Sequence, residues 1–301
     1  MGDLAFRPEI VPASPEILCV QARKKGTLTV AIQRHGSNDI SMPLAASVQE
    51  AKRRRFDGRE PGAPFVSAVI PALNEELNLP HVLPKLEGLV DEVIIVDGLS
   101  TDDTIEVARK LRTDVRIIEE DLPGKGVALR RGFAEARGDI IVALDADGST
   151  DPHEIPAFVG MLLAGFDFVK GSRFLQGAGT SDMPWIRRWG NAALTRLVRL
   201  FFGGQYTDLC YGYNAFWSDV LPLLALDADG FEIETVMNIR ALRADLRVAE
   251  VASFESKRLH GEAKLRALPD GWRVAKTILR ERFTARRLPQ RERARRPESV
   301  A

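Results

Sequence analysis

Short runs rich in valine and isoleucine recur along the middle of the chain and alternate with stretches of helical pattern. Five such runs lie at 65–71, 92–97, 115–118, 139–145 and 167–172, and the first four begin about 25 residues apart. The intervening stretches at 75–88, 102–112, 125–137 and 153–165 have the pattern of helices. Continuous apolar strands that alternate with helices form a mostly parallel sheet covered on both faces. The sequence therefore predicts an α/β fold for this region.

The rest of the chain divides into segments of different composition. Residues 1–63 contain scattered prolines and are expected to form an irregular extension, whereas 64–265 form the α/β domain. Residues 266–285 interleave apolar with basic positions, which predicts an amphipathic C-terminal helix. Residues 286–301 are expected to form an Arg-rich tail.

Charge and cysteine content exclude several classes of protein. The 42 Lys and Arg residues balance 42 Asp and Glu residues, whereas a protein that coats nucleic acid usually has a strong basic excess. Cys19 and Cys210 cannot form a disulfide framework, and no Cys/His spacing indicates a zinc site. No run reaches the roughly 18 apolar residues of a membrane-spanning helix, and no secretory signal is readable. We therefore expect a cytoplasmic protein, or one associated with the cytosolic face of a membrane, without a nucleic-acid partner.

The ends of the predicted strands carry the residues best suited to bind a ligand. In open parallel sheets, ligands bind at the carboxyl ends of the strands, where the strand order reverses. That rule selects Pro71-Ala72-Leu73-Asn74-Glu75, Asp97-Gly98-Leu99-Ser100 and Asp145-Ala146-Asp147. All three segments are polar or turn-forming and follow an apolar strand.

Asp145 and Asp147 place two carboxylates two residues apart at the rim of the sheet. Hard oxygen ligands of this kind hold Mg²⁺ or Mn²⁺ through one or two carboxylates, while phosphates and water complete the coordination. Turn formation alone would also explain the pair. Asp97 could accept hydrogen bonds from a base or a ribose, or could only shape its loop.

Two helix starts follow these strand ends. Asn74-Glu75-Glu76 is expected to open the first helix, where capping alone would account for its side chains. Gly124-Lys125-Gly126 begins another helix, whose N-terminal amides and lysine suit an anionic group. The pattern of a phosphate loop is absent there.

The order of these motifs resembles the family 2 glycosyltransferases, which have a Rossmann-like GT-A nucleotide-sugar fold. The resemblance covers about residues 65–265 and rests on VIPALNEELNL, IIVDGLSTDDT, GKGVALRRGFAEARGD, LDADGSTDP and VKGSRF. The later segments IRRWGNAALTRLVRLFFG, TDLCYGYNAF, GFEIETVMNIRALRADLRVAEV and RLHGEAKL look most like dolichol-phosphate mannosyltransferases and their polyprenyl-phosphate relatives.

The resemblance implies roles for particular residues. Pro71, Ala72, Asn74, Glu75 and Asp97 would line the nucleotide pocket with Lys125, and Asp145 and Asp147 would hold the metal on the donor diphosphate. Arg173 would contact a phosphate, as would an arginine of the Arg187-Arg188 pair. Gly98 and Ser149 depart from the family, which usually has an aspartate and often a glutamine at these positions.

The proposed chemistry builds negative charge on a leaving nucleoside diphosphate, which a divalent cation and arginines stabilise. We expect Asp145, Asp147 and Arg173 to be catalytic in a single displacement that inverts the anomeric carbon. A hydroxyl acceptor would need a general base, for which Asp208, Glu232 and Glu234 are candidates. A polyprenyl phosphate is already anionic, and the acceptor-side residues Arg173, Arg187, Arg188, Asp208 and Arg258 include the arginines that suit a phosphate.

The segment Trp185 to Phe202 bears on membrane contact. Its aromatic and aliphatic residues recur at helical spacing among four arginines, as in a basic amphipathic helix at a lipid interface, although core packing gives a similar stripe. We therefore predict an inverting, Mg²⁺- or Mn²⁺-dependent hexosyltransferase that moves a sugar such as mannose or glucose from a nucleotide sugar to a polyprenyl phosphate, with peripheral membrane contact.

Three alternatives remain open from the sequence. The first is a family 2 enzyme with a soluble hydroxyl acceptor, and the second is a nucleotide-sugar binder without catalysis. The third is a phosphatase of the haloacid-dehalogenase type, in which Asp145 would be the nucleophile. That fold normally begins with the motif, whereas three predicted strands precede it in this chain.

Overall fold

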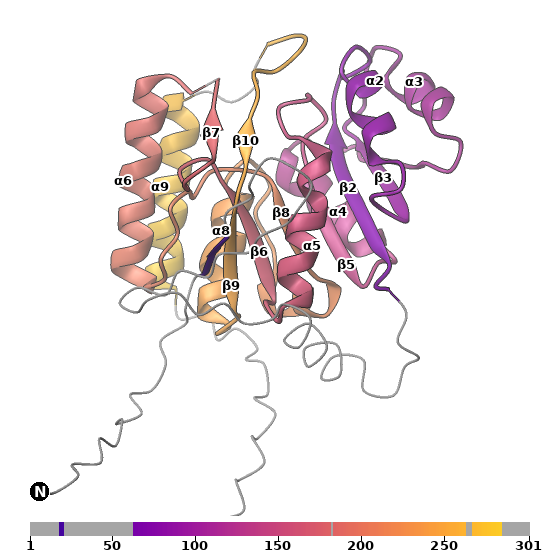
Figure 1. The fold of residues 1–301 in the computed structure, drawn as a ribbon. Coiled ribbons are helices and arrows are strands. Elements are labelled where there is room, and N and C mark those ends of the chain that lie inside the picture. The colour runs from indigo at the N-terminus through magenta and orange to yellow at the C-terminus, as the bar shows by residue number, and fades with distance from the viewer. Residues whose placement is uncertain (1–17, 21–62, 182, 263–266, 285–301) are drawn as a thin grey trace, which may run out of the picture.

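The computed structural model describes residues 18–20, 63–181, 183–262 and 267–284 (Figure 1). One sheet contains the strands β1 (Leu18–Val20), β2 (Val66–Ala72), β3 (Glu92–Asp97), β4 (Arg116–Glu119), β5 (Ile140–Ala143), β6 (Phe168–Ser172), β8 (Asn214–Trp217) and β9 (Val248–Ala252). Their spatial order is β1-β9-β6-β8-β5-β2-β3-β4. Neighbours run parallel except β8, which is antiparallel to both β5 and β6. The predicted mostly parallel α/β sheet is confirmed.

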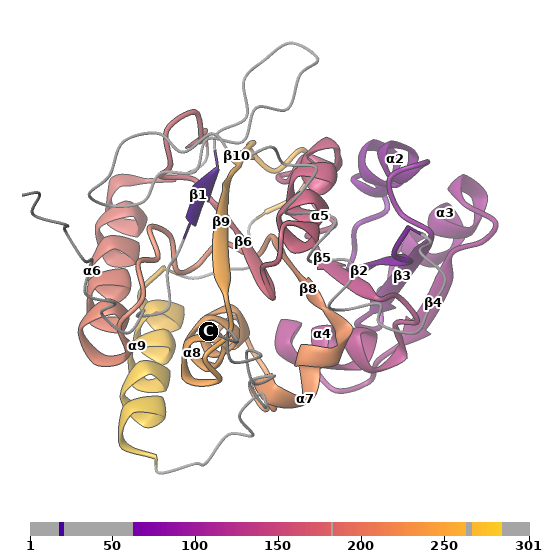
Figure 2. The ribbon, with the colours of Figure 1, turned by 60° about the horizontal axis from the view of Figure 1, so that its bottom comes forward.

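Helices cover both faces of this sheet, as Figure 2 shows. The longer ones are α3 (Thr104–Leu111), α4 (Lys125–Glu135), α5 (Ile155–Leu163), α6 (Trp185–Phe202), α8 (Ile233–Arg243) and α9 (Ala267–Phe283). The shorter ones are α2 (Leu79–Val82) and α7 (Leu221–Leu224), with the 3₁₀ turns η1 (Leu83–Leu86), η2 (Pro152–Glu154) and η3 (Ser218–Val220). A separate small ladder pairs β7 (Gly179–Thr180) with β10 (Phe254–Glu255). The covered faces explain why the central strands are mostly apolar, with a few buried polar residues such as Ser67 and Lys170.

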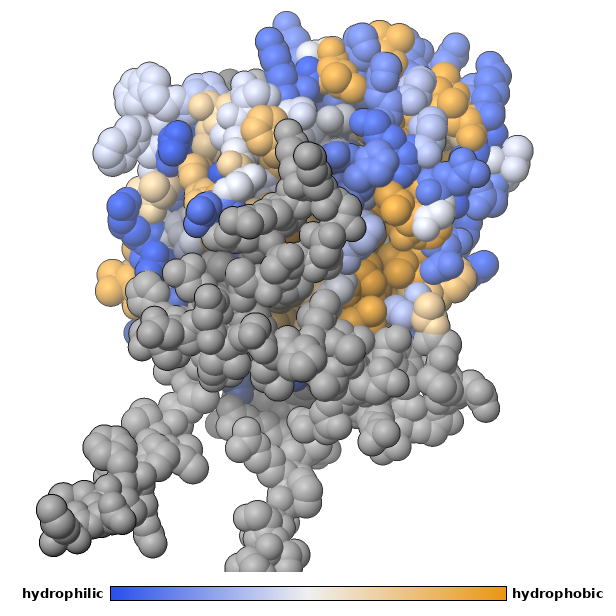
Figure 3. Space-filling view, viewed as in Figure 1, coloured by the Kyte–Doolittle hydropathy of each residue, from blue (hydrophilic) through white to orange (hydrophobic). Residues whose placement is uncertain are grey.

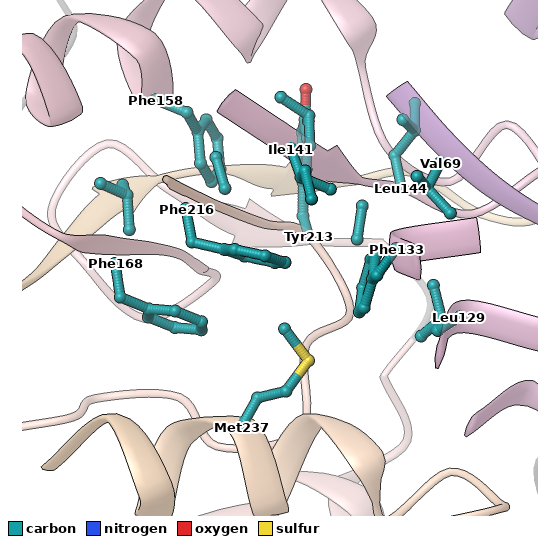
Figure 4. Close-up of a cluster of buried hydrophobic side chains, with 14 of the residues drawn as sticks. Val69, Leu129, Phe133, Ile141, Leu144, Phe158, Phe168, Tyr213, Phe216 and Met237 are labelled. Atoms are coloured by element: carbon teal, nitrogen blue, oxygen red, sulfur yellow. The ribbon is translucent and has the colours of Figure 1, made fainter. Parts of the chain in front are cut away.

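The core between sheet and helices is built around three phenylalanines (Figure 4). Phe133 of α4 meets Phe216 of β8 edge-on with ring centroids 5.2 Å apart, and Phe168 of β6 stacks on Phe216 at 5.9 Å. Met237 of α8 is buried in the same core cluster. Because α4 and α8 both pack here, the starts of these helices are held at defined positions along the sheet edge.

The first predicted helix differs from the structure. The stretch 75–88 contains only the one-turn helix α2 followed by η1, because Pro80 and Pro84 lack the N–H that a continuous helix needs. Asn74-Glu75-Glu76 therefore lies in the loop before α2, and the expectation that it opens a helix is wrong. The loop keeps these residues at the end of β2.

The flanking segments are described only in part. The predicted N-terminal extension and the Arg-rich tail at 286–301 lie largely outside the described residues, but Leu18–Val20 forms β1 at the edge of the sheet. Residues 267–283 form α9, where an amphipathic helix was expected. None of the helices among the described residues combines the length and the apolar content needed to cross a bilayer.

Helix α9 is fastened to α8 by charged side chains. Arg240 of α8 is buried and donates to Glu281 of α9 at 2.7 Å, to Asp227 at 2.6 Å, and to the carbonyl oxygens of Leu224 and Ala225. Arg243 donates to the same Glu281 carboxylate at 2.9 Å. Helix α6 packs against α9, and the two lie side by side at the left of Figure 1.

Candidate active site

A cavity of about 1080 Å³ opens at the carboxyl ends of the parallel strands and extends toward the first turns of α6 and α9. Its polar end is lined by Pro71, Ala72, Glu75, Lys125, Asp145 and Asp147. Its other end is lined by Ile186, Arg187, Trp189, Leu194, Trp272 and Val274. One continuous space therefore joins the carboxylates at the strand ends to a largely apolar groove between two helices.

Lys125 begins α4 and places its ammonium group between two carboxylates. Its Nζ lies 2.6 Å from Asp145 Oδ1 and 2.8 Å from Glu234 Oε1. Burial lowers the pKa of Lys125, but the two carboxylates outweigh burial and hold that pKa above its usual value. Lys125 is thus a fixed cation beside Asp145.

Two backbone amides at the start of α4 are already hydrogen-bonded within the protein. The amides of Gly126 and Val127 donate to the carbonyl oxygen of Asp229, at 2.8 and 3.2 Å. A Cβ atom on Gly126 would lie 2.3 Å from the carbonyl oxygen of Ala228, so only glycine permits this close approach. These two amides are therefore used within the protein, while Gly124, Lys125 and Ala128 line the cavity and the lysine side chain brings a positive charge to it.

Arg258 makes a second bridge, from Asp147 to the loop after β2. Its Nη1 lies 3.3 Å from Asp147 Oδ2, and its Nη2 lies 2.7 and 2.8 Å from the carboxylate oxygens of Glu75. The Arg258 Nε donates to the carbonyl oxygen of His260 at 2.6 Å. The segment after β10 is thereby tied across the strand ends, where Glu75 and Arg258 both line the cavity.

Arg173 lines the cavity, and its guanidinium group is already hydrogen-bonded to carboxylates of the protein. It donates to Asp208 at 2.7 and 2.9 Å and to Glu255 at 2.9 Å, and its side chain is 3% exposed. Asp208 is fully buried, and burial alone would raise its pKa. The neighbouring Arg173 outweighs burial, so the pKa of Asp208 is below its usual value. Asp208 therefore holds the Arg173 guanidinium in place, and its expected role at the acceptor stays a prediction.

The side chains of Asp97 and Asn74 accept hydrogen bonds from residues of the loop after β3. The Asp97 carboxylate accepts from the backbone amide of Ser100 at 2.9 Å and from its hydroxyl at 2.5 Å. Asn74 Oδ1 accepts from the Thr101 amide at 2.8 Å. The Asp97 contacts shape the loop after β3, and the Asn74 contact joins that loop to the one after β2, whereas Pro71 and Ala72 line the cavity directly. For Asp97, the structure shows the loop-shaping contacts with Ser100, and its role toward a base or ribose stays a prediction.

The two arginines at the start of α6 lie in different surroundings. Arg187 lines the cavity, whereas Arg188 is exposed and lies over the ring of Phe174 at 5.6 Å. One turn further along α6, Asn191 also lines the cavity. Its Oδ1 accepts from the amides of Leu209 and Cys210, and its buried Nδ2 has no hydrogen-bond partner among the described residues.

Sequence reasoning missed Asn191, Trp272 and Gly212 as site residues. The i, i+4 spacing of Arg187 and Asn191 puts both on one helix face, which would have identified Asn191. Trp272 is part of the cavity because α9 packs beside α6, and no local pattern predicts that packing. Glu234, one of the bases considered, is paired with Lys125 instead.

The charged end of the cavity fits a divalent cation that shares its coordination with a donor. Asp145 and Asp147 offer hard carboxylate oxygens, and no cluster of three or more metal-ligating side chains occurs in the part of the chain that the structure describes. Mg²⁺ and Mn²⁺ commonly bind through one or two carboxylates plus substrate phosphates. These two residues therefore suit a metal that arrives with a diphosphate.

Comparison with known proteins identifies the family. Residues 67–222 match the sequence profile of Glycosyl transferase family 2. The chain belongs to this family. Membership establishes a glycosyltransferase, which rules out the phosphatase and favours an enzyme over a non-catalytic binder.

Two relatives come from Haloferax volcanii. A dolichyl-phosphate hexose transferase is 31% identical over 219 residues, which cover 71% of this chain and 92% of the relative. The low-salt glycan biosynthesis hexosyltransferase Agl6 is 32% identical over 225 residues, covering 72% of this chain. The matched region spans only 54% of that second relative's length.

A solved structure shares the GT-A fold. Glucosyl-3-phosphoglycerate synthase from Mycobacterium tuberculosis, in complex with Mn²⁺, uridine diphosphate and glucosyl-3-phosphoglycerate, superimposes with a TM-score of 0.59. It is 26% identical, and the match covers 82% of this chain and 86% of the synthase. The GT-A sheet flanked by helices is thereby confirmed.

Proposed function

We propose that this glycosyltransferase moves a hexose from a nucleotide-diphosphate sugar to a polyprenyl phosphate, with Mg²⁺ or Mn²⁺ as its cofactor. The observation that carries the proposal is the continuity of the cavity, from Asp145 and Asp147 at one end to the groove between α6 and α9 at the other. The relative named as a dolichyl-phosphate hexose transferase supports this acceptor class.

The groove suits an acceptor with a charged head and an apolar tail. Ile186, Trp189, Trp272 and Val274 offer apolar surface on the two helices, and Arg187 on the same wall offers a cation. A phosphate prefers charge-assisted hydrogen bonds, whereas an isoprenoid chain gains by burying apolar area. In this arrangement Arg187 and the unpaired amide of Asn191 orient the acceptor phosphate.

The donor end would bind the nucleoside diphosphate. Asp145 and Asp147 would hold the metal ion, which when bound neutralises charge on the leaving diphosphate. Lys125 and Arg258 reach the same place and would donate to phosphate oxygens. An oxygen of the acceptor phosphate forms the new bond to the anomeric carbon as the bond to the diphosphate oxygen breaks, and the electron pair leaves with the nucleotide. The acceptor oxygen is already anionic, so this displacement requires no general base.

Membrane contact is the second part of the proposal. Trp185, Trp189 and Trp272 are 72, 69 and 62% exposed near the mouth of the cavity, and α6 carries four arginines and no acidic residue. Tryptophan and arginine together suit a lipid interface. Exposed apolar residues also occur singly among hydrophilic ones elsewhere, as at the upper right of Figure 3, so the grouping around the cavity is the informative feature.

Nucleoside diphosphate release by the purified protein tests the reaction. The protein would be incubated with Mn²⁺ and a panel of GDP- and UDP-sugars, with a short polyprenyl phosphate or the matching polyprenol as control. We expect release that depends on the lipid phosphate and that falls in Trp272→Ala more for longer acceptor chains than for shorter ones. Release with the polyprenol alone, or without any lipid, would contradict the proposal.

A soluble phosphorylated acceptor is the second candidate. It is favoured by the likeness to the solved synthase whose complex contains glucosyl-3-phosphoglycerate. Adding 3-phosphoglycerate to the same release assay separates the two, since this acceptor has a phosphate but no apolar tail. Turnover with it that is insensitive to Trp272→Ala would replace the polyprenyl phosphate with a soluble acceptor.

A further inference from the structure

Two side-chain cations each bridge one aspartate of the site to a glutamate from another segment. Lys125 Nζ contacts Asp145 at 2.6 Å and Glu234 at 2.8 Å. Arg258 contacts Asp147 at 3.3 Å. The same guanidinium group meets both carboxylate oxygens of Glu75 at 2.7 and 2.8 Å. In both bridges a cation joins one aspartate of the Asp145-Ala146-Asp147 segment to a glutamate that lies far from it in the chain.

These bridges place protein cations where a metal ion would have to bind. A divalent ion held by Asp145 and Asp147 would approach the oxygens that Lys125 and Arg258 contact, and like charges at such distances repel strongly in a partly buried site. The cations must therefore give up part of their contact with the aspartates. The donor diphosphate is the anion that could receive them.

The glutamates explain how the cations stay in reach during that exchange. Glu75 and Glu234 are buried, at 6 and 4% exposure, so each needs a cation partner at all times. Arg258 holds Glu75 through two short contacts but Asp147 through a single long one. Asp147 can therefore be released while Arg258 remains anchored on Glu75.

We propose that Glu75 and Glu234 are positioning residues that hold Arg258 and Lys125 against the aspartates until the metal and the diphosphate bind together. This inference rests on the proposed function and concerns the donor end of the same site. Its consequence is strong positive coupling between metal and nucleotide, because each ligand relieves the charge conflict that the other creates. By linkage, the metal strengthens nucleotide binding by the same factor.

Mn²⁺ binding measured by electron paramagnetic resonance of the free ion tests this coupling without turnover. For the unmodified protein we expect UDP or GDP to tighten Mn²⁺ binding by about tenfold or more. Arg258→Gln should raise the affinity for Mn²⁺ alone by several-fold, because Asp147 is freed, and should reduce the coupling. Arg131→Gln is the matched control, since Arg131 lies on α4 but is half exposed and pairs with Glu135.

The Glu75→Gln variant distinguishes a positioning role of Glu75 from a purely structural one. Without the Glu75 charge, Arg258 is left to Asp147, so the affinity for Mn²⁺ alone should fall rather than rise. The double variant should follow Arg258→Gln, since Glu75 acts only through the arginine. Lys125→Gln provides an independent second bridge to test, and circular dichroism confirms that each variant is folded.

Two results would overturn the inference. One is Mn²⁺ affinity in the unmodified protein that neither UDP nor GDP changes, and the other is weaker Mn²⁺ binding in both Arg258→Gln and Glu75→Gln. The Mn²⁺ titration contains no acceptor and does not measure sugar transfer. Failure of polyprenyl phosphate as an acceptor would therefore disprove the proposed function while leaving the coupling to stand or fall on its own result.

Discussion

Replacing Gly212 by alanine would put a methyl group into the charged cluster beside Asp145. The added Cβ would lie 2.9 Å from Lys125 Nζ, 3.2 Å from Asp145 Oδ2 and 3.3 Å from Glu234 Oε1. All three contacts are with the ends of side chains, so the protein can accommodate the methyl group by shifting the charged groups. The variant therefore perturbs the positions of these groups more than it perturbs the backbone.

The size of the effect follows from those contacts. A displacement of about 1 Å at a reacting centre costs up to about 100-fold in rate, so we expect kcat/KM for the donor to fall about 10- to 100-fold. Overpacking costs about 1–3 kcal/mol of stability. Gly212 has no positive φ, so alanine recovers about 0.4–1 kcal/mol through the unfolded chain. A net loss of about 1–2 kcal/mol leaves most of the protein folded.

Nucleoside diphosphate release across donor concentrations, together with urea unfolding, measures both quantities. Gly160→Ala is the matched control, because a Cβ at this position of α5 meets nothing within 4 Å. It should raise stability by about 0.5–1 kcal/mol and leave turnover unchanged. Wild-type kcat and donor KM in Gly212→Ala would refute the argument that the close backbone approach serves the site.

Three further perturbations test the surrounding structure. Burial is the largest cause that raises the pKa of Glu154 to about 6, so the ionised form is disfavoured in the fold and Glu154 should add stability as pH falls from about 6 to 4.5. Burial also raises the pKa of Glu250, to about 7, so both carboxyls contribute to the rise, and urea unfolding should show a rise smaller by about 2 kcal/mol in Glu154→Gln than in the unmodified protein. Asp208→Asn leaves the buried Arg173 with half its partners and should lower the unfolding free energy by about 3–5 kcal/mol; an unchanged denaturation midpoint would contradict that. Leu99 is half exposed with φ +62°, so Leu99→Gly should stabilise by about 0.5–1 kcal/mol in thermal unfolding, and a lower melting temperature would show that the side chain contributes packing.

The central strands were predictable because burial on both faces makes their sequences mostly apolar. The run at 92–97 coincides with β3, and those at 65–71 and 167–172 lie within one residue of β2 and β6. Strand β8 was not predictable in its place, since nothing local indicates that NAFW inserts antiparallel between β5 and β6. The prolines that break the first helix were visible, but a helical apolar pattern outweighed them in the prediction.

For the site, the sequence indicated which residues gather but not how they pair. Asp145 was expected at a ligand because it follows a strand, and Lys125 was expected near an anionic group because it begins a helix. The contact between Arg258 and Glu75 joins residues 183 positions apart, and no local pattern reports such a pair. The engagement of Arg173 by Asp208 is likewise a matter of packing, since an arginine after a strand could equally have faced the cavity free.

The attachment of α9 links the wall of the cavity to the stability of the domain. A chain that ended before α9 would lose a wall of the cavity and would also leave Arg240 without the Glu281 carboxylate in an apolar interior. Removing one partner of a buried ion pair costs about 3–5 kcal/mol, a large share of the roughly 5–15 kcal/mol that stabilises a typical domain. In a cell, such a truncated product would populate unfolded states that proteases remove. Loss of helix α9 would therefore remove part of the cavity wall and destabilise the domain at the same time.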